Sequence, residues 1–189
     1  MSKPNRIRAG VTAPALTLLL ALAACNQAED VPPLGTAQQM MAQEVQPTAE
    51  VFWGAVGSKS ELIDGEPVFT DWQPEGDVEW EEVRASAARL GELGRVLMTP
   101  DYAEGRGDDW IAYSQGLVDA AVQAEQAALA RDPDAVFEVG GTIYAVCSAC
   151  HRMYPPEQLP EGVTVDDIAQ PRPNEDLSLE EYVEESEPD

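Results

Sequence analysis

A five-residue motif near the end of the last helical pattern constrains this 189-residue chain more than any other feature. Residues 147–151 read Cys-Ser-Ala-Cys-His, and His151 is the only histidine in the sequence. Positions i, i+3 and i+4 lie on one face of an α-helix. We therefore expect Cys147, Cys150 and His151 to project from the same side of a helix, where all three can meet one flat ligand.

The C-x-x-C-H pattern is the attachment signal for c-type haem. Two thiols form thioether bonds with the haem vinyl groups, and the adjacent imidazole becomes the proximal ligand of the iron. The sequence predicts one covalent haem c, attached through Cys147 and Cys150, with His151 as the proximal iron ligand.

Other uses of these cysteines fit the sequence less well. A structural zinc site needs about four Cys, His or carboxylate ligands, whereas outside the motif the chain has no other His and only one other Cys, Cys25. A thioredoxin-like pair opens a helix in a βαβ unit, whereas this pair comes near the end of a helical pattern. An ordinary reactive or disulfide-bonded pair without haem remains as an alternative.

The amino-terminal region has the architecture of an export signal. Basic residues open the chain, and an uncharged run over residues 9–24 ends at Cys25. This run is shorter than the roughly 20 residues that a membrane-spanning helix needs, so residues 1–24 are predicted to be a signal peptide. The ending Leu-Ala-Ala-Cys resembles the lipobox of bacterial lipoproteins, which implies lipidation of Cys25; ordinary secretory cleavage is the alternative.

The lipoprotein resemblance also implies a location. Asn26 follows the cysteine, and in that family a residue other than Asp resembles sorting to the outer membrane. We expect a lipid-anchored protein facing the periplasm, with residues 25–35 as a polar tether.

The net charge excludes one class of partner. Eleven Lys and Arg residues stand against 35 Asp and Glu residues, for a net charge of −24. Binding to nucleic acid depends on clustered basic side chains, so no nucleic-acid partner is expected. Protein partners are expected to present Lys or Arg, and encounters with them should slow as salt is added.

Apolar residues repeat at helical spacing in four segments, residues 36–57, 77–98, 108–130 and 133–153. Pro47 is expected to kink or break the first segment. Residues 58–76 are expected to form a long connection, because they contain Gly, Pro and mixed polar residues. No segment has a convincing strand pattern. We predict an all-α fold: an up-and-down antiparallel four-helix bundle with covalently bound haem, over residues 36–154. A Pro-rich, acidic tail follows over residues 155–189.

The sixth position of the iron is filled by a methionine, by a weaker donor or by nothing, and a ligand there, if there is one, has to come from upstream of the motif. The candidates are methionines, and Met153 lies too close to His151 to reach the opposite side of the ring. Met41 shares its helical face with apolar residues, whereas Met40 falls on a more polar face. Met41 is therefore the predicted distal ligand and Met98 the fallback; Met41 as a core-filling side chain is the alternative.

These features together resemble the class II c-type cytochromes, the family of cytochrome c-prime. The resemblance rests on the 147–151 motif closing the fourth of four helices and on Met41 in the first helix, ahead of Phe52 and Trp53. It implies a four-helix bundle around one haem. In this family a distal methionine accompanies a six-coordinate, low-spin electron carrier, whereas a non-coordinating residue leaves five-coordinate iron that binds NO or CO. Relatives often dimerise through the first helix, which allows a homodimer here.

The expected function is one-electron transfer by a monohaem cytochrome whose redox partners have a basic docking surface. No enzymatic activity is expected, because a lone histidine bound to iron cannot also act as a general base. A five-coordinate gas-binding haem protein and a haem-free structural lipoprotein remain as alternatives. Arg152 is expected either to pair with a haem propionate or to face water.

Overall fold

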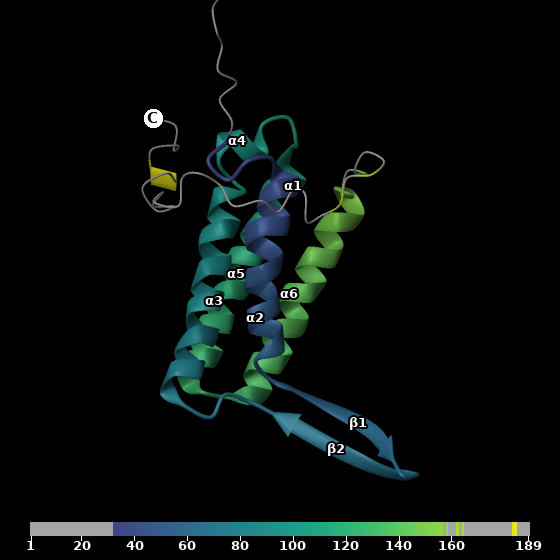
Figure 1. Ribbon diagram of the computed structural model, residues 1–189. Helices are drawn as coiled ribbons and strands as arrows, with labels where there is room; N and C mark the ends of the chain where they lie inside the picture. The colour runs from purple at the N-terminus through teal and green to yellow at the C-terminus, as the bar shows by residue number, and fades with distance from the viewer. Residues whose placement is uncertain (1–31, 157, 159–161, 163, 165–182, 185–189) are drawn as a thin grey trace, which may run out of the picture. The chain divides into compact units, whose positions relative to one another are not determined.

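The computed structural model describes residues 32–156, 158, 162, 164 and 183–184. Within this part the chain is mostly helical, with one small sheet (Figure 1). The predicted signal peptide, Cys25, residues 26–31 of the tether and most of the tail lie outside the described residues. None of the described helices combines the length and apolar character needed to cross a membrane.

Three of the four predicted helical segments have nearly the expected bounds. Helix α3 spans Asp77–Val96, α5 spans Asp108–Ala130 and α6 spans Pro133–Met153, while the short α4, Pro100–Ala103, lies between α3 and α5. The side chain of Asp132 caps α6 by accepting hydrogen bonds from two backbone N–H groups of its first turn. These boundaries were predictable because capping residues and prolines act locally.

The first helical segment consists of α1 (Ala37–Met40), a π-helical turn η1 (Met41–Val45) and α2 (Gln46–Gly54). Thr36 and Gln39 form a capping box at its start. The predicted disruption takes another form, because the helix continues through Pro47. The N–H of Gln46 donates to the carbonyl oxygen of Met41, an i→i+5 bond, and this wider turn gives the proline ring room that a regular turn denies it.

The π turn also changes which methionine is buried. Met40 and Val45 both lie in the core, five residues apart, although a regular helix would place Met41 above Val45. The expectation that Met40 occupies a polar face is therefore wrong. Met41 is only partly buried and packs at the edge of the core.

Residues 58–76 contain a hairpin that the sequence analysis missed. Strand β1 (Gly57–Ile63) pairs antiparallel with β2 (Glu66–Trp72). The two turn residues, Asp64 and Gly65, have φ values of 53° and 87°, as a tight hairpin turn requires. The strictly all-α prediction is corrected to a mostly helical fold with a two-stranded sheet.

The long helices lie side by side and alternate in direction along the chain (Figure 1). Helix α5 packs against both α3 and α6, and α2 packs against α3. Arg84 of α3 forms an ion pair with Glu125 of α5 at 2.6 Å. The two helices approach closely at Gly94, where a Cβ atom would lie 2.8 Å from Val118 Cγ2 and 3.3 Å from the carbonyl oxygen of Ser114.

We predict that Gly94→Ala lowers the free energy of unfolding by about 1–3 kcal/mol, because the new methyl group meets a stiff side chain and backbone atoms. Gly141→Ala is the matched control, since a Cβ at this helical glycine has open space around it. The control should raise the free energy of unfolding by about 0.5–1 kcal/mol through helix propensity. Urea unfolding measures both, and equal shifts in the two variants would contradict the close approach.

Candidate functional site

A cavity of about 570 Å³ lies among the helices and brings the predicted site residues together. Its size falls within the usual range for small-molecule and cofactor sites. Its walls come from the first helical segment, the end of α3, α5 and α6. The lining residues are Met41, Val45, Gln46, Ala49, Glu50, Trp53, Leu97, Trp110, Tyr113, Ser114, Leu117, Tyr144, Val146, Cys147, Ser148, Cys150, His151 and Arg152.

The motif residues share one side of α6, as the helical spacing predicts. Cys147, Cys150 and His151 all line the cavity. The two thiols are free and partly buried, whereas His151 is exposed. One ligand seated in the cavity can therefore contact both sulfur atoms and the imidazole.

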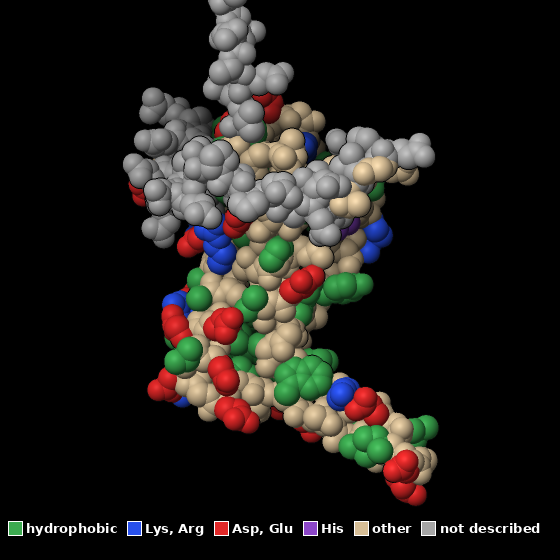
Figure 2. Space-filling model, viewed as in Figure 1, with side chains coloured by type: hydrophobic (Ala, Val, Ile, Leu, Met, Phe, Trp, Pro, Cys, Tyr) green, Lys and Arg blue, Asp and Glu red, His purple; other side chains and the backbone are tan. Residues whose placement is uncertain are grey.

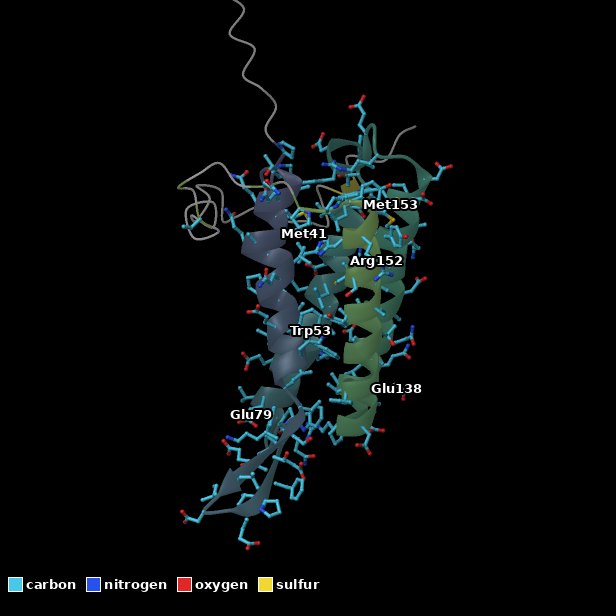
Figure 3. The ribbon with its side chains drawn as sticks, turned by 90° about the vertical axis from the view of Figure 1, so that its right-hand side faces the viewer. Met41, Trp53, Glu79, Glu138, Arg152 and Met153 are labelled. Carbon is cyan, nitrogen blue, oxygen red and sulfur yellow. The ribbon has the colours of Figure 1, made fainter. Side chains whose placement is uncertain are left out.

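Met41 lines the same cavity from the first helical segment. Figure 3 shows it on the helix neighbouring α6, near the end of α6 that carries Arg152. The fallback, Met98, is partly buried and does not line the cavity, although its neighbour Leu97 does. The fold thus places Met41, and not Met98, in a common cavity with the motif.

A contact between α2 and α6 closes one end of this region. Trp53 Nε1 donates to the carbonyl oxygen of Gly140 at 2.9 Å, and a Cβ atom on Gly140 would lie 3.3 Å from Trp53 Cδ1. The Trp53 ring also meets Tyr144 edge-on, with ring centroids 6.2 Å apart. From this contact α6 diverges from α2 toward its carboxyl end (Figure 1). The cavity lies between the diverging helices.

Sequence reasoning did not assign Trp53 and Tyr144 a place in the site. A usable signal was present for Tyr144, because it precedes Cys147 by three residues and so lies on the same helical face. Trp53 carried no such signal. Its role depends on α6 lying beside α2, a contact between residues 87 positions apart.

An aromatic cluster supports the other end of the cavity. Trp110 Nε1 donates to the carbonyl oxygen of Leu97 at 2.6 Å, and its ring meets Tyr154 edge-on at 5.1 Å between centroids. The guanidinium of Arg106 lies 4.5 Å from the Trp110 ring centroid, and Tyr154 Oη donates to the carbonyl oxygen of Arg106. These contacts hold the chain directly after the motif against α5.

The cavity contrasts in charge with the rest of the surface. Acidic side chains are frequent on the face shown in Figure 2, including the hairpin. Besides His151, the lining includes one carboxylate, that of Glu50, and one guanidinium, that of Arg152. The Glu50 carboxylate accepts a hydrogen bond from Gln46 Nε2 at 2.9 Å. Within the described residues, no group of three or more His, Cys, Asp or Glu side chains could hold a metal ion by itself.

Burial affects the chemistry of the two thiols. It raises the pKa of Cys147, and it raises the pKa of Cys150, with a smaller contribution from repulsion by Cys147. Removing a thiolate from water is unfavourable, so the neutral thiol is preferred. Both sulfur atoms are therefore protonated at neutral pH in the chain without a ligand.

Searches for similar proteins give no further assignment. No family model, curated protein or solved structure matches this chain.

We predict that, in the haem-free Cys25→Ser chain, iodoacetamide alkylates Cys147 and Cys150 with a half-maximal rate at a higher pH when the chain is folded than when urea unfolds it. The thiolate is the nucleophile, so a raised pKa moves the reaction to higher pH. Mass spectrometry of each modified peptide over a pH series measures the shift. Coincident pH profiles for the folded and unfolded chains would contradict the burial of the thiols.

Proposed function

We propose that this protein is a monohaem c-type cytochrome that carries single electrons. The observation that carries this proposal is the placement of Cys147, Cys150, His151 and Met41 around one largely apolar cavity. The donor set fits a haem, because two thiols and a neighbouring imidazole are the attachment groups of haem c, and Met41 lines the same cavity. The fold assignment that follows is an up-and-down antiparallel four-helix bundle of the class II cytochrome type.

Each residue then has a chemical role. Cys147 and Cys150 would hold a haem by adding their S–H groups to its two vinyl groups, which forms two thioether bonds and releases nothing. His151 would ligate the iron, and Met41 would supply a second, thioether ligand. Arg152, which lines the same cavity, would pair with a propionate.

A bound haem supplies one-electron exchange between ferric and ferrous iron. The chain's residues set the conditions for that exchange. As an iron ligand, the thioether of Met41 would favour the ferrous state and raise the reduction potential relative to a histidine or hydroxide ligand. The walls formed by Trp53, Leu97, Trp110 and Leu117 limit the access of water.

The proposed setting follows from the sequence. A lipid on Cys25 would anchor the protein to a membrane facing the periplasm, in the outer membrane by the resemblance to lipoproteins. Its acidic surface fits redox partners with a basic docking surface, and it disfavours nucleic acid as a partner.

We predict that the chain, produced with a c-type haem maturation system, gains the mass of one haem that denaturation does not remove. Replacing both Cys147 and Cys150 by Ser should abolish covalent haem, because no thioether can form. Cys25→Ser is the control and should retain it. Intact-mass measurement and haem absorption test this; a colourless wild-type protein would overturn the proposal in favour of a haem-free structural lipoprotein.

We predict that Met41→Ala converts low-spin haem iron to the high-spin form, because it removes the sixth ligand. The matched controls are Met40→Leu, a similar-sized change in the core beside Met41, and Met98→Leu at the fallback position. Both should keep the low-spin absorption spectrum.

Two results would correct the ligand assignment. High-spin iron that binds CO in the wild-type protein would indicate the five-coordinate gas-binding alternative, with Met41 as a packing residue. A low-spin spectrum that Met41→Ala leaves unchanged would place the distal ligand elsewhere.

A further inference from the structure

The hairpin of residues 57–72, called the arm below, is a part of the fold that the helices do not bury. Every residue of β2 is exposed, and in β1 only Gly57 is not. Two-stranded hairpins are at best marginally stable alone in water. The arm therefore adds exposed surface without adding to the core.

The base of the arm is held firmly to the end of α2. Trp72 Nε1 donates to the carbonyl oxygen of Gly54 at 3.0 Å, and the Trp72 ring lies against Gly57, where any Cβ atom would collide with the indole. The pairing register runs from Gly57 opposite Trp72 to Ile63 opposite Glu66. These contacts fix how the arm leaves the helices.

One face of the arm presents a group of apolar side chains to solvent. The register places Ser60 opposite Phe69 and Leu62 opposite Pro67 on the same face. Leu62 is 77% exposed and Phe69 is 75% exposed. Isolated exposed apolar residues are common, whereas several together on a protruding element indicate an interaction site.

The charges of the arm identify the chemistry of its partner. Asp71 lies on the same face as Leu62 and Phe69, and Asp64 lies in the turn. Glu61 and Glu66 lie on the opposite face. The one basic residue of the arm, Lys59, pairs with Glu61 at 2.9 Å. A second copy of the chain or an anionic membrane would bring like charges together, whereas a basic surface would be attracted.

We propose that the arm docks into a partner protein that presents an apolar groove bordered by Lys and Arg, which receives Leu62 and Phe69. The arm leaves the end of the helices near Glu138, whereas Arg152 and the motif lie toward the other end of α6 (Figure 3). Docking is therefore separate from the candidate haem site and does not depend on the proposed electron transfer.

The test uses the full-length protein in the cells that produce it. Phe69→p-benzoyl-phenylalanine places a photo-crosslinker on the arm, and Leu129→p-benzoyl-phenylalanine, at an exposed position on α5, is the matched control. We expect one protein to be crosslinked from position 69 and not from position 129. Crosslinks to a second copy or to lipid, no crosslink, or the same products from both positions would overturn the proposal.

Binding of the identified protein then tests the chemistry. The isolated partner should bind the wild-type chain with an affinity that falls as salt is added. The double variant Leu62→Ser with Phe69→Ser should bind at least about tenfold more weakly, as loss of a central apolar anchor requires. Unchanged affinity in this variant, or affinity independent of salt, would refute the docking mode.

Thermal unfolding and the absorption spectrum serve as controls for the double variant. Both should match the wild type, because Leu62 and Phe69 contact solvent and lie away from the cavity. A colourless wild-type protein would overturn the haem proposal and leave the crosslinking result valid, so the two proposals fail separately.

Discussion

The contact between Trp53 and Gly140 is the constraint on which the site depends. It joins α2 to α6 by a hydrogen bond from Nε1 to a backbone carbonyl oxygen, at a position where an added Cβ atom would press against the Trp53 ring. Because α6 diverges from this point, space opens toward Cys147 and His151. Trp110, Leu97 and the chain after the motif close the other side, so the cavity is a consequence of how α6 packs.

The π turn is the second device that shapes the cavity. The turn contains one extra residue, so Met40 lies in the core and Met41 lines the cavity that it shares with the motif residues of α6. Glu44, within the turn, forms an ion pair with Arg89 of α3 at 2.8 Å, which ties this irregular part of the helix to its neighbour. π turns are frequent at functional sites, in keeping with the distal role that we propose for Met41.

The charges divide the molecule into regions with different chemistry. A cavity lined mainly by aromatic and aliphatic side chains suits a large apolar cofactor, with Arg152 available to its acidic groups. The acidic and apolar arm lies at the other end of α6 from the motif. This separation lets the proposed partner binding and the proposed electron transfer be altered independently.

The sequence by itself determined the helical bounds and the shared face of the motif, because capping, prolines and helical periodicity act within a few residues. Asp64-Gly65 is a local signal for a tight hairpin turn. The flanking strands did not support it, because they are exposed on both faces and lack a clear alternation of apolar and polar residues. Only the tertiary structure decided that Met40 is buried and Met41 faces the cavity, and that Trp53 meets Gly140. Those outcomes depend on a widened turn and on contacts between distant segments. The spacing of apolar residues within one helix predicts neither of them.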